Sequence, residues 1–546
     1  MSTAAPARLG GHVVAESLTA LGAEAAFGVP GIHALAIWEG LRDCPVAVYG
    51  ARTELCAGFA ADGYARSSGR PAPLLLSTGP GALNSLTSIM EAGSSHVPVV
   101  AISSHVPSHL IGRGRGYLHD LPDQMASFRP LVKYAARASS VPAIPGILAE
   151  AWTVALAPPS GPVYVEMPVD VLSAAAGECP LVSGPSADRG ARPAAPEAVR
   201  RAAGLLAAAR RPVIWAGGGT IRATASEQLI GLAELLQAPV ATTYMGKGVI
   251  ADAHPLAVGC GCDEAAVQEL LRAADVVLCV GTELGAETTG QYALEFAGRL
   301  IQLDAAPERI GASYPALALV GDARLTLSAL AAELGSGQTG SGDPGDVAAE
   351  VASVRSRIRA GLEGQGRELE LGLLTAIEAA LPPDAITAWD MTILAYWAAP
   401  HLRIASGQQF LYPLGSGTLG YAWPAALGAA VAHPGRRVLA VVGDGGIQYA
   451  LAELGTAAQH GIRAALLIVD DGGYGILREY QQAQFGRTAS VELPGLDLPA
   501  IVRGFGVPVR ESRPDDLAEQ LAWAFAQDGP AAVVLRARLT AAAPTS

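Results

Sequence analysis

Short apolar runs alternate with helical patterns along most of the chain. Ten such runs are rich in β-branched or aliphatic residues, and all but the last end in or beside Gly, Pro, Ser or Asp: PVAVYG, APLLLST, VPVVAISS, GPVYVEMP, RPVIWAGG, DVVLCVG, RLIQLD, RVLAVVGD, AALLIVDD and AAVVLRA. Strands that alternate with helices predict parallel sheets with helices on both faces. The pattern therefore predicts an α/β protein with doubly wound parallel sheets.

Two stretches have the composition of linkers. One runs from Cys179 to Pro196 and the other from Gly335 to Gly345, and both are rich in Pro, Gly and Ser. They divide the chain into segments 1–180, 195–333 and 350–546, and a chain of 546 residues is long enough for about three domains. The first and third segments are similar in length and in sequence pattern, which suggests two related domains that flank a third.

Two of the apolar runs stop abruptly in acidic and glycine residues. RVLAVV leads into Gly443-Asp444-Gly445, and AALLIV leads into Asp470-Asp471, 26 to 27 residues after Asp444. The stretch between them has helical spacing, so a strand–helix–strand unit would place Asp444 and Asp471 beyond the carboxyl ends of two parallel strands. Carboxylates beside a glycine turn suit Mg²⁺ and phosphate. Alternatively, the aspartates only cap strand ends and helix starts.

The GDG, the spacer and the acidic pair followed by Gly and an aromatic residue resemble the signature of thiamine diphosphate (ThDP) enzymes, the family of acetolactate synthase, pyruvate decarboxylase and benzaldehyde lyase. The resemblance implies a pyrimidine-binding, a central and a diphosphate-binding domain, in that order. It also implies ThDP with Mg²⁺ or Mn²⁺. The implied metal ligands are the side chains of Asp444 and Asp471 and the carbonyl of Gly473, with Gly443, Gly445 and Gly446 near the diphosphate. The family usually has Asn at the position of Asp471.

Three further motifs resemble the same family. ARTELCAGFAADGYAR, residues 51–66, is similar to the helix that carries the activating glutamate, here Glu54, and we expect its small apolar neighbours to desolvate the carboxyl. GSGTLGYAWPAALGA, residues 415–429, is similar to the segment that bends the cofactor, with Leu419 as the apolar wedge and the Gly417 carbonyl on the aminopyrimidine. WDMTILAYW would place Thr392 at the diphosphate. Without the resemblance, Glu54 is an ordinary helix-start acid and residues 415–429 a glycine-rich turn.

Two histidines are candidates for acid–base work. His119 aligns with a position that is Gln in benzaldehyde lyase and His in pyruvate decarboxylase, and His33 projects from the first βα turn. Either could instead be structural. Within the family, the chain most resembles decarboxylases of 5-guanidino-2-oxopentanoate. A guanidinium side chain would need a carboxylate partner; Glu479 or Asp120 could serve, or both could be surface acids.

The resemblance implies ThDP- and Mg²⁺-dependent decarboxylation of a small 2-oxo acid, followed by protonation to an aldehyde or by carboligation to a second carbonyl. It also implies a homodimer or homotetramer in which Glu54 of one chain faces the metal ligands of another. A true FAD-containing acetolactate synthase is a weaker alternative, because residues 281–285 read GTELG without the phosphate-binding arginine, so FAD is not expected. A nucleotide-dependent oxidoreductase, suggested by Gly217-Gly218-Gly219, lacks the full fingerprint, and a non-catalytic ThDP-binding protein would not need Glu54.

Composition narrows the class further. The net charge is −13 and no Lys/Arg-rich run occurs, which argues against nucleic acid as a partner. We find neither a signal peptide nor about 20 uninterrupted apolar residues, so no membrane association is expected. The six cysteines form no CxxC pair, and the pattern predicts a cytoplasmic protein.

Overall fold

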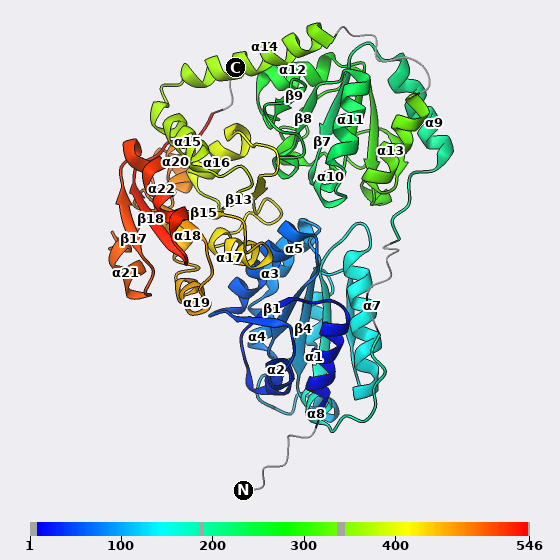
Figure 1. Ribbon diagram of the computed structural model, residues 1–546, viewed down its shortest axis with the longest axis vertical. Coiled ribbons are helices and arrows are strands. Elements are labelled where there is room, and N and C mark those ends of the chain that lie inside the picture. Colours follow the sequence, from blue (N-terminus) through cyan, green and yellow to red (C-terminus); the bar gives the residue numbers. More distant parts are fainter. Residues whose placement is uncertain (1–7, 183, 185–189, 336–343, 544–546) are drawn as a thin grey trace.

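The computed structural model describes residues 8–182, 184, 190–335 and 344–543, and in these residues the chain forms three six-stranded sheets (Figure 1). The strand orders are β2-β1-β3-β4-β6-β5, β12-β11-β10-β7-β8-β9 and β14-β13-β15-β16-β18-β17, and neighbouring strands are parallel throughout. Helices separate the strands in sequence, so each sheet is wound in both directions from an internal strand. The predicted fold class is confirmed.

The N-terminal sheet lies in the blue and cyan part of Figure 1. Its strands are β1 (Ala25–Gly28), β2 (Ala47–Gly50), β3 (Ala72–Leu76), β4 (Val99–His105), β5 (Tyr134–Arg137) and β6 (Val163–Pro168). The helices around it are α1 (Gly10–Ala20), α2 (Leu35–Arg42), α3 (Glu54–Ser68), α4 (Pro80–Leu83), α5 (Leu86–Ser94), α6 (Gln124–Phe128), α7 (Ile144–Leu156) and α8 (Val169–Ser173).

The central sheet, mainly green in Figure 1, has shorter strands at one edge. Its strands are β7 (Pro212–Ala216), β8 (Val240–Thr242), β9 (Ala257–Gly259), β10 (Val276–Val280), β11 (Arg299–Asp304) and β12 (Leu317–Val320). Its helices are α9 (Pro196–Ala208), α10 (Gly218–Arg222), α11 (Ser226–Leu236), α12 (Ala265–Ala273) and α13 (Ala323–Leu334).

The C-terminal sheet, yellow to red, follows the long helix α14 (Pro344–Glu363). Its strands are β13 (Ile386–Trp389), β14 (Gln409–Leu411), β15 (Val438–Gly443), β16 (Ala465–Asp470), β17 (Val509–Ser512) and β18 (Ala531–Arg536). Its helices are α15 (Glu368–Ala380), α16 (Ile393–His401), α17 (Ala422–Ala432), α18 (Asp444–Ile447), α19 (Glu453–His460), α20 (Gly475–Phe485), α21 (Leu498–Gly504) and α22 (Leu517–Ala526).

All ten predicted strand runs coincide with strands, and the other eight strands are three or four residues long. The three predicted segment ranges stay a prediction, and most of the predicted linker 335–345 and part of the linker 179–196 lie outside the described residues. The helix expected over residues 447–461 is interrupted between α18 and α19. Tyr449 lies in this interruption, where its carbonyl oxygen accepts from Cys56 Sγ at 3.7 Å rather than from its own helix.

The N-terminal and C-terminal domains meet where α3 crosses α17. Both helices are buried along most of their length, and a helix that is apolar on all sides belongs in a protein interior. Glycines permit the close approach: a Cβ atom at Gly63 would lie 2.0 Å from the Ala425 carbonyl oxygen, and one at Gly428 would lie 1.8 Å from that of Ala60. The crossing fixes the start of α3, and therefore Glu54, relative to the C-terminal sheet. None of the described helices has the length and apolar character that a bilayer span requires.

Candidate active site

Three neighbouring strands of the C-terminal sheet deliver the predicted cofactor residues to one edge. β13, β15 and β16 are adjacent in the sheet, and each is followed by one of the predicted motifs. Thr392 begins α16 just after β13, Asp444 follows β15, and Asp471 follows β16. Because parallel strands end at the same edge, the three motifs converge where open α/β sheets bind ligands.

The two predicted metal-ligating carboxylates lie close enough to interact. Within the described chain, Oδ1 of Asp444 and Oδ1 of Asp471 are buried and accept no hydrogen bond. Burial raises the pKa of Asp444 to about 7, and the nearby Asp471 adds to the rise. Burial also raises the pKa of Asp471, which the charge of Arg478 opposes. A divalent cation between the two would remove both the repulsion and the unsatisfied acceptors, so the residues fit a Mg²⁺ site.

Acidic, histidine and cysteine side chains of the described residues do not complete a metal cage by themselves. No group of three or more His, Cys, Asp or Glu side chains in the described ranges is arranged to hold a metal ion. A hard cation takes about six oxygen ligands. The remaining ligands would therefore have to come from backbone carbonyls, water and the oxygens of a bound anion, which is the arrangement that a diphosphate-linked metal requires.

The glycines of the GDGG turn are required by close packing. A Cβ atom at Gly443 would lie 3.1 Å from Thr392 Oγ1, so the predicted diphosphate residue stands directly beside the turn. A Cβ atom at Gly445 would lie 2.7 Å from the ring of Tyr474, and one at Gly446 would lie 2.9 Å from Asp390 Oδ2. Thr392 makes no side-chain hydrogen bond to cap its own helix. The turn can therefore approach a ligand closely with its backbone.

The predicted cofactor-bending turn is anchored on both sides. Gly417 is exposed and has a φ of +64°, and Leu419 is half-buried. On one side, the backbone amide and the hydroxyl of Ser416 donate to Glu91 Oε2 at 2.7 and 2.8 Å. On the other side, the Gly420 amide donates to Asp390 Oδ2 at 2.9 Å. Asp390 is 1% exposed, and burial raises its pKa to about 7.

Behind this turn lies a buried charged cluster that no motif in the sequence indicates. Arg66 Nε contacts Asp62 Oδ1 at 2.9 Å, and Arg66 Nη2 contacts Glu91 Oε1 at 3.0 Å; the two carboxylate side chains are fully buried. The Tyr421 hydroxyl donates to Asp62 Oδ1 at 2.7 Å. The cluster links α3 and α5 of the N-terminal domain to the residues on either side of the cofactor turn.

Glu54 lies at the carboxyl edge of the N-terminal sheet. It begins α3 shortly after β2, and the Thr53 hydroxyl caps this helix by accepting from the Cys56 amide. The amides of Arg52 and Thr53 donate to Glu453 Oε1 at 3.0 and 3.2 Å, so an acid of the C-terminal domain fixes the approach to Glu54. This role of Glu453 was not predicted.

The carboxyl of Glu54 is half-buried, which corrects the expectation that its helix neighbours desolvate it. The neighbours Ala57 and Ala61 pack into the core of the N-terminal domain. Glu54 Oε2 accepts from Asn84 Nδ2 at 3.3 Å, and a Cβ atom at Gly81 would lie 3.1 Å from Oε1. In the described chain no hydrogen bond or ion pair joins Glu54 to Asp444 or Asp471. Glu54 thus presents a partly open carboxyl at its sheet edge.

The two predicted acid–base histidines lie side by side at this same edge. The ring centroids of His33 and His119 are 5.3 Å apart in an edge-on arrangement, and the Nδ1 atom of each is buried without a partner in the described chain. Burial lowers the pKa of His33, with His119 and His105 adding to the effect. His119 has a φ of +67°, and its carbonyl packs against Gly79, where a Cβ atom would lie 2.5 Å away.

A buried hydrogen-bond chain supports the loop that carries His119. The Gly79 amide donates to Gln124 Oε1 at 2.7 Å, and Gln124 Nε2 donates to the Tyr164 hydroxyl at 2.7 Å. That hydroxyl donates to Glu166 Oε2 at 3.0 Å, and Arg137 Nε donates to Glu166 Oε1 at 2.6 Å. The motif LHDLPDQ contains Gln124, but only its contacts reveal the positioning role.

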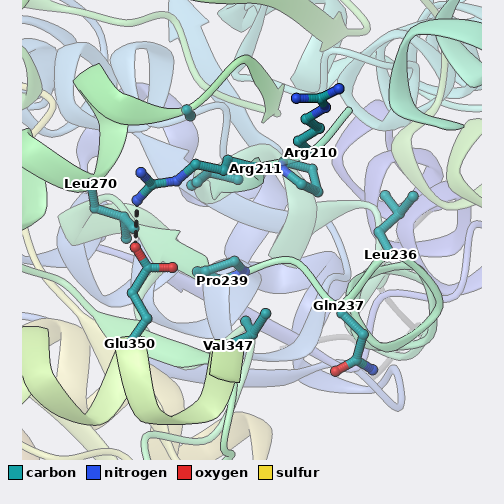
Figure 2. Close-up of a pocket in the computed structure, with 11 residues that line it drawn as sticks. Arg210, Arg211, Leu236, Gln237, Pro239, Leu270, Val347 and Glu350 are labelled. Carbon is teal, nitrogen blue, oxygen red and sulfur yellow. Dashed lines mark hydrogen bonds and ion pairs between the residues drawn. The ribbon is translucent and has the colours of Figure 1, made fainter. Parts of the chain in front are cut away.

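Of two cavities, one lies away from these edges and does not belong to the site, whereas the other lies against the loop that carries His119. Figure 2 shows one at the start of β7, on the opposite, amino edge of the central sheet, where Arg211 pairs with Glu350 at 2.6 Å. Its volume of about 40 Å³ holds a water or two and no cofactor. A larger cavity of about 360 Å³ lies against the loop that follows β4, between Ile111 and Arg137.

Comparisons with known proteins identify the family. Residues 8–127, 199–330 and 390–535 match, in this order, the N-terminal TPP binding domain, the central domain and the C-terminal TPP binding domain of thiamine pyrophosphate enzymes; TPP is another name for ThDP. The chain belongs to the thiamine pyrophosphate enzyme family. The predicted family, enzyme class and organic cofactor are thereby confirmed, and the Gly217 turn falls within the central domain of this family rather than in a dehydrogenase.

Several relatives match nearly the whole chain. Over 533 residues it is 36% identical to the probable 2-ketoarginine decarboxylase AruI of Pseudomonas aeruginosa, covering 96% of this chain and 93% of the relative. It is 30% identical to a probable acetolactate synthase large subunit of Methanococcus aeolicus, covering 95% and 90%. It is 31% identical to the sulfoacetaldehyde acetyltransferase of Rhodobacter capsulatus, covering 79% and 77%.

Proposed function

We propose that the chain uses ThDP and Mg²⁺ to decarboxylate a 2-oxo acid, with 2-ketoarginine (5-guanidino-2-oxopentanoate) as the donor and an aldehyde as the product. The observation that carries the proposal is the pair of interacting carboxylates of Asp444 and Asp471, each with a buried oxygen that accepts no hydrogen bond within the described chain, beside a crowded glycine turn. The similarity to a probable 2-ketoarginine decarboxylase supports the choice of donor. Carboligation is the second candidate, supported by the similarity to acetolactate synthases.

The predicted residues at the carboxyl edge of the C-terminal sheet bind the cofactor or its metal ion. Asp444, Asp471 and the Gly473 carbonyl hold Mg²⁺, and Mn²⁺ would satisfy the same oxygen ligands. Thr392 and the backbone of Gly443, Gly445 and Gly446 would hold the diphosphate beside this metal site. Leu419 supports the bend of the cofactor, and the Gly417 carbonyl accepts from its aminopyrimidine. When bound, ThDP supplies the nucleophilic carbon and accepts the electron pair that departing CO₂ leaves behind.

The residues at the carboxyl edge of the N-terminal sheet hold and transfer protons. Glu54 exchanges a proton with the aminopyrimidine, and its half-open position leaves one side of the carboxyl free for this contact. His33 and His119 hold or deliver a proton at the substrate oxygen. Burial lowers the pKa of His33, so the ring is uncharged near neutral pH and can accept a proton there.

We further propose a homodimer or homotetramer in which the two edges come from different subunits. Large apolar side chains are exposed beside both edges, and a second copy would cover them. Beside the N-terminal edge these side chains are Ile32, Leu35 and Leu118, and beside the C-terminal edge they are Leu477, Tyr480 and Phe485. We expect the enzyme in the cytoplasm, where its six free cysteines would stay reduced, and we expect no FAD.

The direct test offers purified protein, with ThDP and Mg²⁺, a panel of 2-oxo acids that includes 2-ketoarginine and pyruvate. CO₂ release is recorded and the products are analysed by mass. An aldehyde from 2-ketoarginine is the expected result. A coupled product such as acetolactate from pyruvate would favour the carboligase, and no CO₂ from any acid, with ThDP bound, would contradict both.

A further inference from the structure

Five buried polar atoms without partners gather at the carboxyl edge of the N-terminal sheet. Within the described chain they are His33 Nδ1, Ser77 Oγ, His105 Nε2, His119 Nδ1 and Asp120 Oδ1. They follow the ends of β1, β3 and β4, which are neighbours in the sheet. Buried polar atoms are normally hydrogen-bonded, so a group of unpartnered ones indicates a place where a polar ligand binds.

Asp120 is the member of this group that carries a negative charge. Its side chain makes no ion pair or hydrogen bond within the described ranges, while its backbone amide donates to the Tyr117 carbonyl at 3.0 Å and closes the turn that contains His119. The deeper His105 is fully buried, and its pKa is lowered by burial, although Glu166 and Asp120 oppose this effect. Within the described ranges no ion pair gives the Asp120 carboxylate a counter-charge.

Three other candidate acids are already engaged. Glu479 Oε2 accepts from the Ala541 amide at 2.9 Å. Glu166 is bound by Arg137 and by Tyr164, and Asp123 Oδ1 caps α6 by accepting from the Ala126 amide at 3.0 Å. A partly buried carboxylate without a partner is costly, so Asp120 is the acid whose missing partner a ligand would supply.

We propose that Asp120 binds the cationic end of the substrate side chain and selects a guanidinium-bearing 2-oxo acid over a neutral one of similar length. This inference rests on the proposed function, because it assigns the substrate to the site that His33 and His119 share. A guanidinium presents parallel N–H donors that match a carboxylate. The unpartnered Ser77 hydroxyl and histidine nitrogens beside Asp120 offer further acceptors for its remaining N–H groups.

The test compares Asp120→Asn with the wild-type enzyme in binding and in turnover. Binding to the cofactor-free protein is measured by calorimetry with 5-guanidinopentanoate and with hexanoate, neither of which can react. Turnover is measured with 2-ketoarginine and with 2-oxohexanoate. Asp120→Asn is expected to lose about 10- to 100-fold in affinity for 5-guanidinopentanoate and in kcat/KM for 2-ketoarginine, the range for a lost charged hydrogen bond, with both neutral compounds unchanged.

Two matched variants control the experiment. Asp123→Asn lies on the same loop and keeps its helix cap, because Asn caps as well as Asp, and Glu479→Gln removes the alternative acid; neither is expected to change the preference for the cation. An equal loss for charged and neutral compounds in Asp120→Asn, or no loss at all, would overturn the inference.

The wild-type arm separates this inference from the proposed function. If the wild type releases CO₂ from neutral 2-oxo acids and none from 2-ketoarginine, the proposed donor is wrong whatever the variant does. The binding of 5-guanidinopentanoate to the cofactor-free protein still decides the role of Asp120 in that case, because it needs no turnover. Loss of that binding in Asp120→Asn alone supports the cation contact, and equal binding by both proteins contradicts it.

Discussion

Replacement of Arg66 by Met tests the cluster that connects α3 to the cofactor turn. The guanidinium contacts Asp62 at 2.9 Å and Glu91 at 3.0 Å, and its Nη1 atom donates to the Tyr412 carbonyl at 3.1 Å. Its side chain is 6% exposed, and both carboxylate partners are fully buried. Methionine fills a similar volume without charge, so the variant removes the cation that contacts both carboxylates, and Arg222 remains as a cation that interacts with them.

The expected loss of unfolding free energy is about 3–5 kcal/mol at neutral pH, the range for a broken buried ion pair. This is a large share of the total of about 5–15 kcal/mol that is usual for a folded protein. The loss depends on pH. Burial raises the pKa of Asp62 even with Arg66 present, and Arg66 opposes the rise, so the folded-state pKa rises further in the variant. Between the unfolded value, near 4, and this raised value, the unfolded chain releases a proton that the folded chain keeps. Raising the pH through that interval therefore destabilises the variant, and lowering it restores stability.

The assay is urea unfolding followed by tryptophan fluorescence between pH 5 and pH 8, together with ThDP binding. Arg66→Met should unfold at lower urea, with a deficit that shrinks toward pH 5, and should bind ThDP more weakly because Glu91 no longer fixes the Ser416 amide. Arg70→Met is the matched control. Arg70 pairs with Glu24 on the surface, and its loss should cost less than about 1 kcal/mol. A deficit in Arg66→Met that is equally small, or that does not change with pH, would refute the reasoning.

The site itself is open to four simpler tests. Glu54→Gln should lower CO₂ release about 10²- to 10⁴-fold, the usual range for a general acid–base group, while ThDP binding measured by calorimetry stays close to wild type. Gly446→Ala should weaken ThDP binding, because the new methyl would lie 2.9 Å from Asp390 Oδ2, whereas Gly435→Ala, with nothing within 4 Å, should bind normally. Removal of Mg²⁺ by a chelator should release ThDP on a desalting column, and Mg²⁺ or Mn²⁺ should restore its retention. The NMR titration midpoint of His33 should fall below about 6.5, because burial disfavours its charged form; a midpoint at or above that value would contradict the burial argument.

The sequence predicts those features that depend on strong local patterns. Long buried strands such as β15 and β16 are continuous apolar runs, and the acidic residues at their ends are enough to predict that Asp444 and Asp471 lie at one sheet edge. The eight strands outside the ten runs are three or four residues long, and strands this short seldom show a clear period. One of them, β13, precedes Asp390, and without that strand its position beneath the cofactor turn could not be inferred.

The residues that position the site could not be predicted from the sequence, because their hydrogen-bond partners are distant in the chain. Glu91 meets Ser416, 325 positions later, and Glu453 meets Arg52 across 401 positions. Neither acid belongs to a recognisable motif, and each takes its role from the crossing of α3 and α17. Gln124 does lie in the motif LHDLPDQ, but its side-chain oxygen accepts from the backbone amide of Gly79 rather than contacting the substrate.

Complementation between two inactive variants tests whether one active site takes its two edges from different subunits. Glu54→Gln disables the N-terminal edge and Asp444→Asn disables the C-terminal edge, and each protein alone should release almost no CO₂ from a substrate that the wild type uses. If the edges do come from two subunits, a mixed dimer contains one intact site. Co-expression in equal amounts should then restore about a quarter of the wild-type activity, since about half of the dimers are mixed and each has one of two sites intact. Activity that stays at the level of the single variants, in mixed dimers confirmed by mass, would contradict the proposal that the Glu54 edge and the Asp444 edge meet across subunits.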